Sequence, residues 1–222
     1  MHNFNLLFYH LQKKQLLKHM STTRNPLYPV FLKLHQLRLL IVGAGVVGTE
    51  KLEFILKSSP EAQITVVAPD ISDTVRELIH ANPQARIRVH QRGFQPKDIQ
   101  GHDLVIAATN LQDLNWSVQQ AAKAAGKLVN VADTPALCDF YLGSIVTRGP
   151  LKVAISTNGQ SPTFAKRFRQ LLEATIPEEV DELIDQLKLI RDQLQGDFEY
   201  KVQALNDLTA PLAKPGSASS NN

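Results

Sequence analysis

The segment from Leu39 to Gly48 constrains the fold of this chain more than any other. An apolar run, Leu39-Leu-Ile-Val42, leads directly into Gly43-Ala-Gly-Val-Val-Gly48, and a helical pattern follows from Thr49 to Leu56. A strand, the spacing Gly-x-Gly-x-x-Gly and a helix, in that order, are typical of a dinucleotide-binding turn. The alternative is a glycine-rich turn that binds nothing. We predict that NAD is the cofactor and that this turn holds it through Gly43, Ala44, Gly45, Val46, Val47 and Gly48.

A second apolar run, Ile64-Thr-Val-Val-Ala68, ends in Pro69-Asp70. Asp70 lies near the distance beyond the fingerprint at which a carboxylate binds a ribose hydroxyl of NAD. A carboxylate there disfavours the 2′-phosphate of NADP, and Arg76 stands more than a helical turn further on. We therefore expect Pro69 and Asp70 to contact the cofactor and NAD to be preferred over NADP.

Further along, strands alternate with helices, which indicates an α/β fold with a Rossmann-like parallel sheet. Strands are expected at 87–90, within 101–108 and at 128–132, with a helix that contains Trp116, Val118, Ala121, Ala122 and Ala125. Ligands bind beyond the carboxyl ends of such strands. Thr109 and Asn110 are therefore predicted to bind cofactor, and Asp133 is predicted to face the reaction centre.

The pattern changes after Asp133. Ser144–Arg148 and Leu151–Ser156 flank the turn Gly149-Pro150, which predicts a β-hairpin. Ser161 and Pro162 are suited to the N-cap and first position of a following helix. A later helix has an apolar stripe made of Val180, Leu183, Ile184, Leu187, Ile190 and Leu194. Because the hairpin and stripe expose more apolar surface than one nucleotide-binding domain can cover, we expect a homodimer.

The composition suits a globular protein: 43% of the 222 residues are hydrophobic, 20% are charged, and the net charge is +3. We expect no nucleic-acid or membrane partner, and a single cysteine, Cys138, fits a reducing cytoplasm. Met20 is an alternative start. The expected organisation is an extension over 1–24 that is disordered or follows a misassigned start, an NAD-binding Rossmann domain over 25–138, a dimerisation and substrate segment over 139–175, a C-terminal helical domain over 176–208 and a disordered tail over 209–222.

Six short words occur in the order and spacing of one family. They are Val42–Gly48, Val66–Asp70, Ala107–Asn110, Asn130–Asp133, Leu137–Phe140 and Ala154–Pro162. From about Tyr28 to about Leu194 the chain resembles the precorrin-2 dehydrogenase/sirohydrochlorin ferrochelatase family, the dehydrogenase part of siroheme synthases. The resemblance implies a homodimer that oxidises precorrin-2 to sirohydrochlorin with NAD and, in some members, inserts Fe²⁺. Many members carry Ala where Gly48 stands, a difference that we expect to be harmless because both residues are small.

Oxidation of a reduced tetrapyrrole removes a hydride, which nicotinamide accepts, and a proton, which needs a base. Asp133 matches the aspartate that the family uses, and a carboxylate at the end of the fifth strand can take the proton or stabilise developing positive charge. The alternative is that Asp133 caps the turn before Pro135. Asp139 is the nearest rival, and we interpret it as structural.

A polycarboxylate substrate needs amide donors and positive charge. The turn before the Ser161 helix and the basic residues on that helix offer both, although an ordinary capped helix with a solvated basic face remains the alternative. Arg148, Lys152 and Arg169 are further candidates for the charge. The predicted substrate-binding residues are Asn158, Gly159, Ser161, Lys166 and Arg167.

The sequence leaves the metal ligands, if any, unknown. His35, His80, His90 and His102 show no metal-ligand spacing and are interpreted as surface histidines. Iron insertion would then rely on the nitrogens of the macrocycle, with Asp133 drawing protons from them.

Two other functions are compatible with the first half of the chain: a non-catalytic NAD-sensing module and a dehydrogenase for another small substrate. A sensor has no need of Asp133 beside a capped basic helix, and no catalytic His or Lys pattern supports the other dehydrogenase.

Overall fold

The structure, a computed structural model, describes residues 25–213. Of these residues, 32–213 belong to one compact unit and 25–31 to another. The predicted extension over 1–24, with the alternative start at Met20, lies outside the described residues, as do residues 214–222 of the predicted tail.

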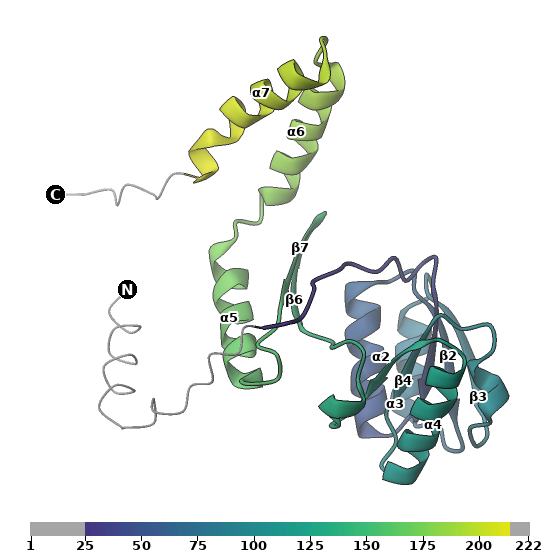
Figure 1. Cartoon of the computed structure of the whole chain (residues 1–222). Helices are drawn as coiled ribbons and strands as arrows, with labels where there is room; N and C mark the ends of the chain where they lie inside the picture. Colours follow the sequence, from purple (N-terminus) through teal and green to yellow (C-terminus); the bar gives the residue numbers. More distant parts are fainter. Residues whose placement is uncertain (1–24, 214–222) are drawn as a thin grey trace, which may run out of the picture. The chain divides into compact units, whose positions relative to one another are not determined.

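Five parallel strands form the central sheet, as predicted (Figure 1). Val42 at the end of β1 is in register with Val67 of β2 and Ala107 of β4, and Ala107 is in register with Val131 of β5. The carboxyl ends of these four strands therefore meet at one edge. Strand order reverses between β1 and β4, which is where α/β sheets bind ligands. The sheet order is β3 (Arg86–Gln91), β2 (Gln63–Ala68), β1 (Arg38–Val42), β4 (Leu104–Ala107) and β5 (Leu128–Val131).

Three α-helices cover the two faces of this sheet. Leu52 and Leu56 of α2 (Val46–Ser58) and Val75 of α3 (Asp73–Ala81) belong to one buried cluster. Val118 and Ala122 of α4 (Gln112–Ala124) belong to a second. Because helices cover both faces, the central strands are continuous apolar runs instead of alternating ones. Short 3-10 helices at Pro96–Ile99 (η2) and Pro135–Leu137 (η3) complete this part.

Helix α4 forms where the sequence predicts a helix. Val118 and Ala122 are buried together with Asn115 and Gln119, whereas Trp116 is 54% exposed and Ala125 is exposed. Asn115 is buried because its amide has hydrogen-bond partners there.

The predicted hairpin and capped helix are confirmed. Strands β6 (Ser144–Arg148) and β7 (Leu151–Ile155) pair antiparallel, with Val146 opposite Val153. Helix α5 (Pro162–Thr175) begins at Ser161, whose hydroxyl accepts a hydrogen bond from the amide of Phe164 at 3.2 Å. Val146, Ile155 and Ala165 form a small buried cluster between hairpin and helix.

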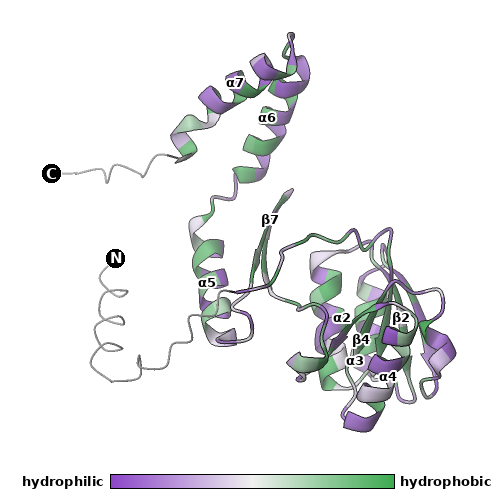
Figure 2. Cartoon of the chain, viewed as in Figure 1, coloured by the Kyte–Doolittle hydropathy of each residue, from purple (hydrophilic) through white to green (hydrophobic). Residues whose placement is uncertain are grey.

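Helices α6 (Val180–Gln193) and α7 (Phe198–Thr209) carry no buried residue. Figure 2 shows apolar residues along both. The predicted tail begins too early, because Thr209 ends α7 and Ala210–Ala213 forms a 3-10 turn (η4). None of the described helices combines the length and apolarity needed to cross a membrane.

Candidate functional site

The glycine loop between β1 and α2 has the geometry of a phosphate cradle. Gly43 adopts φ +106°, and a Cβ there would lie 2.5 Å from the carbonyl oxygen of Ala108. Gly45 precedes α2, and a Cβ there would meet nothing within 4 Å. The amide of Thr49 donates to the carbonyl of Gly45, so the amides of the preceding turn have no acceptor within the helix. With no acidic residue in this first turn, the loop fits a dinucleotide diphosphate.

Gly48 is a stricter requirement than expected. A Cβ at this position would lie 2.1 Å from the carbonyl oxygen of Gly43 and 2.7 Å from its carbonyl carbon. The expectation that alanine is harmless here is therefore wrong for this backbone, since both contacts are with main chain that a rotamer change cannot relieve.

Two more predicted cofactor segments lie at the same edge of the sheet. Asp70 follows β2 and is exposed, with Pro69 beside it. Thr109 follows β4 and is held by the buried side chain of Asn115. The Asn115 Oδ1 atom accepts from the Thr109 amide at 3.1 Å and from its hydroxyl at 2.8 Å, and Nδ2 donates to the Thr109 carbonyl at 2.9 Å. Asn115 was missed, because a polar residue in a helix carries no sign of which loop it will bind.

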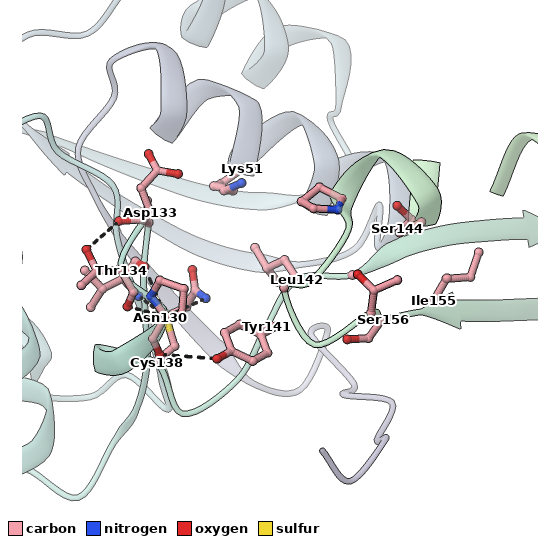
Figure 3. A pocket seen from close by; sticks show the side chains of 18 residues that line it. Lys51, Asn130, Asp133, Thr134, Cys138, Tyr141, Leu142, Ser144, Ile155 and Ser156 are labelled. Carbon is pink, nitrogen blue, oxygen red and sulfur yellow. Dashed lines mark hydrogen bonds between the residues drawn. The ribbon is translucent and has the colours of Figure 1, made fainter. Parts of the chain in front are cut away.

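A cleft of about 370 Å³ opens between the end of β5 and the hairpin with its following helix. Figure 3 shows Asp133 and Lys51 on the side of the nucleotide-binding fold, and Ser144, Ile155 and Ser156 on the side of the hairpin. Both charged and apolar side chains line the cleft, which suits a large amphipathic ligand.

Asp133 holds its carboxylate at this cleft through an unusual backbone conformation. Its φ is +57°, in the left-handed region that few residues besides glycine, asparagine and aspartate adopt. The turn is closed by the Thr134 amide, which donates to the carbonyl of Val131 at 3.2 Å. Among the described residues no donor contacts the Asp133 carboxylate, so the structure gives no support to the capping alternative.

The loop after Asp133 is fixed by polar contacts to β5. The Asp139 carboxylate accepts from the Val129 amide at 3.0 Å and pairs with the ammonium of Lys123. This is the structural role expected for Asp139. The buried Asn130 amide donates to the carbonyl of Phe140 at 2.8 Å. Burial raises the pKa of the Cys138 thiol, which exchanges hydrogen bonds with the main chain of Val131.

The predicted substrate-binding residues are only partly gathered at the cleft. Gly159 lines it, together with Pro162 and Ala165 of the Ser161 helix. Asn158, Ser161, Lys166 and Arg167 are not among the lining residues. Lys51 is a lining residue that sequence reasoning missed. The signal was its place three residues after Gly48, on the same face of the nucleotide-binding helix.

Other basic candidates have structural partners instead. The Arg148 guanidinium donates to the carbonyl of Glu173 at 2.8 Å, while its Nε atom is buried without a partner. Arg169 pairs with the carboxylate of Glu173 one turn later. Lys152 donates to the carbonyl oxygen of Ser58 and, at 3.2 Å, to its hydroxyl. Their charges therefore stabilise helices α5 and α2.

One histidine is not at the surface as expected. Both ring nitrogens of His102 have partners, the carbonyl of Asp98 at 2.8 Å and the hydroxyl of Thr65 at 2.9 Å, and burial lowers its pKa. Within residues 25–213, no three His, Cys, Asp or Glu side chains are grouped as metal ligands.

Two family models match the chain in succession. One described as "Putative NAD(P)-binding" covers residues 30–144, and one described as "Sirohaem biosynthesis protein central" covers residues 148–175. The first therefore includes the glycine loop and Asp133, and the second includes the end of the hairpin and helix α5.

Curated relatives agree with these models. The "Siroheme synthase" of Pseudoalteromonas atlantica is 38% identical over 171 residues, which cover 77% of this chain and 36% of that protein. The "Siroheme synthase" of Nitrosomonas europaea is 38% identical over 173 residues, which cover 78% of this chain and 36% of that protein. The chain thus spans about a third of the length of these relatives.

A solved structure has a similar fold over most of its length. The protein described as "SirC, precorrin-2 dehydrogenase" is 28% identical, with a TM-score of 0.66 over 82% of this chain and 89% of that one. The likeness therefore extends beyond the sheet into the segment that forms the second wall of the cleft.

Proposed function

Because this chain belongs to the precorrin-2 dehydrogenase family, which forms the dehydrogenase part of siroheme synthases, we propose that it oxidises precorrin-2 to sirohydrochlorin with NAD. The observation that carries this proposal is the position of Asp133. Its carboxylate lies at the cofactor edge of the sheet and lines a cleft whose other wall is the hairpin. A non-catalytic sensor is disfavoured because it has no use for this cleft.

NAD supplies the hydride acceptor when it is bound. The residues of the chain then have two tasks. Backbone amides at the start of α2 hold the diphosphate, and Thr109, fixed by Asn115, lines the same edge of the sheet. The Asp133 carboxylate accepts the proton that leaves the substrate as the hydride departs, and its negative charge stabilises the cationic character that develops.

The test is anaerobic incubation of the chain with precorrin-2 and NAD, followed by the absorbance of sirohydrochlorin. We expect product with NAD and none without it. The control is Asp133→Ala, which should bind NAD and make little product. Absence of turnover by the unaltered chain under these conditions would overturn the proposal.

Insertion of Fe²⁺ into sirohydrochlorin is included as a second reaction of the same cleft. Two pyrrole protons must leave as the metal enters, and Asp133 is the carboxylate that lines the cleft. The macrocycle supplies the ligands of the metal. Incubation with sirohydrochlorin and Fe²⁺ should give siroheme faster than the uncatalysed reaction, and Asp133→Ala should remove the difference.

We also propose that the chain acts as a homodimer. Helices α6 and α7 expose large apolar side chains, among them Leu189 at 60% and Phe198 at 80%, although their sequences are amphipathic (Figure 2). A second copy of the chain would cover such surface. Light scattering should give twice the mass of one chain, and a monomer at micromolar concentration would contradict this assembly.

A further inference from the structure

We propose that Lys51 binds a carboxylate of the substrate inside the cleft, an inference that rests on the proposed function. Lys51 lies on α2, and its side chain, 25% exposed, lines the cleft together with Asp133 (Figure 3). Among the residues that line this cleft, Lys51 is the one cation. The site therefore has a single positive charge to offer a polycarboxylate.

Lys51 has no strong competing partner. Its ammonium lies 3.4 Å from the carboxylate of the adjacent Glu50, whose side chain is 69% exposed. Such exposed pairs contribute little and dissociate readily. Within the described residues no ion pair joins Lys51 to Asp133, so the Lys51 ammonium is not neutralised by the carboxylate of the cleft.

The charge is needed where it stands. A substrate that brings a carboxylate close to Asp133 places two negative charges in a partly enclosed cleft, where repulsion is stronger than in bulk water. Lys51 offsets that repulsion and forms a charge-assisted hydrogen bond to the substrate. It also fixes which end of the macrocycle lies beside Asp133.

The alternative ligand for Lys51 is the diphosphate of the cofactor. The diphosphate is held by amides in the first turn of α2, which begins at Val46, whereas Lys51 lies in the next turn. Binding of NAD and binding of the tetrapyrrole therefore have to be measured separately.

The experiment compares Lys51→Gln with Lys51→Arg and with Lys57→Gln. Lys57 is the matched control because it lies in the last turn of the same helix, is exposed and does not line the cleft. Two quantities are measured for each variant: KM for precorrin-2 with saturating NAD, and Kd for sirohydrochlorin by absorbance titration without NAD. The Kd for NAD is measured alongside by fluorescence.

We expect Lys51→Gln to raise KM and the sirohydrochlorin Kd by about 10- to 100-fold, the range for loss of a charged hydrogen bond. The Kd for NAD in Lys51→Gln should stay within about twofold of that in the unaltered chain. Lys51→Arg should keep KM and the sirohydrochlorin Kd close to their unaltered values, and Lys57→Gln should change neither. Added salt should weaken sirohydrochlorin binding less in Lys51→Gln than in the unaltered chain.

Unchanged KM and sirohydrochlorin Kd in Lys51→Gln would overturn the assignment, as would a loss confined to NAD. The sirohydrochlorin titration tests the Lys51 contact, whereas turnover of precorrin-2 tests the proposed function. If the unaltered chain binds sirohydrochlorin through Lys51 but does not oxidise precorrin-2, the proposed function fails and the carboxylate contact stands. If it binds no sirohydrochlorin, the Lys51 proposal fails.

Discussion

The ammonium group of Lys152, on strand β7, donates hydrogen bonds to the carbonyl and hydroxyl oxygens of Ser58, the last residue of helix α2. The lysine thereby caps the negative end of the helix that begins at the glycine loop. It also fastens the hairpin to the nucleotide-binding fold, so that the two walls of the cleft keep their spacing.

Lys152→Met should lower the free energy of unfolding by about 1–2 kcal/mol, because the end of α2 loses a charged hydrogen bond. KM for precorrin-2 should rise as the hairpin loosens, while NAD affinity is retained. Urea unfolding and steady-state kinetics measure the two effects. Lys97→Met, at an exposed lysine of η2, is the control and should change neither.

Substitutions of Asp133 should separate stability from turnover. Asp133→Gly relieves the left-handed backbone and should raise the free energy of unfolding by up to about 1 kcal/mol. Turnover should nevertheless fall by on the order of 10²-fold or more, since the proton acceptor is lost. Asparagine adopts the same left-handed backbone conformation, so the Asp133→Asn variant should fold normally and show the same loss of turnover as Asp133→Gly. A near-normal rate in either variant would remove Asp133 from the chemistry.

The fingerprint glycines should fail in different ways. Gly48→Ala should destabilise the fold by about 1–3 kcal/mol, because its Cβ would overlap the carbonyl of Gly43. Gly45→Ala should leave thermal unfolding unchanged, since that Cβ enters open space, but should weaken NAD binding at least about 10-fold. If instead Gly48→Ala melts like the unaltered chain, the backbone there is more adaptable than the structure indicates.

Asp70 should govern the choice between the two nicotinamide cofactors. The unaltered chain should use NAD in preference to NADP, because a carboxylate at the end of β2 repels the 2′-phosphate. Asp70→Ala should lower the ratio of kcat/KM with NAD to kcat/KM with NADP. Comparable efficiency with both cofactors before the substitution would contradict the role of Asp70.

His102 should make the fold sensitive to mild acid. Burial lowers its pKa below the usual value near 6.5, so the unfolded chain takes up the proton first. The stability that neutral His102 contributes is complete above pH about 6.5 and is lost as pH falls toward the lower, folded-state pKa. Unfolding in urea at pH about 7.5 and about 5.5 should show a smaller difference for His102→Gln than for the unaltered chain.

The features that could be predicted from the sequence are those encoded by residues close together in the chain. The alternation of apolar strands with helical segments predicted the parallel sheet, and the spacing of Gly43, Gly45 and Gly48 after an apolar strand predicted the turn that leads into α2. Contacts between residues far apart in the chain could not be predicted. Lys152 reaches Ser58 almost a hundred residues away, and nothing local distinguishes it from a solvated lysine.

Orientation on a helix was the other difficulty. Neither Lys51 nor Asn115 belongs to a motif, so the sequence does not show that Lys51 lines the cleft or that Asn115 holds Thr109. Which side of a helix faces a loop or a cleft depends on how the helix packs, and that is settled by tertiary contacts that periodicity describes only on average.

The hydrogen bonds between Asn115 and Thr109 lower the entropic cost of binding the cofactor. The buried side chain of Asn115 accepts two hydrogen bonds from Thr109 and donates one to it, and these fix the loop in the absence of any ligand. The backbone of this loop loses its conformational entropy when the protein folds, so this loop does not have to become ordered when the nucleotide binds. The Thr109 loop is therefore preformed, and its contribution to dinucleotide affinity is not reduced by an entropic cost of ordering.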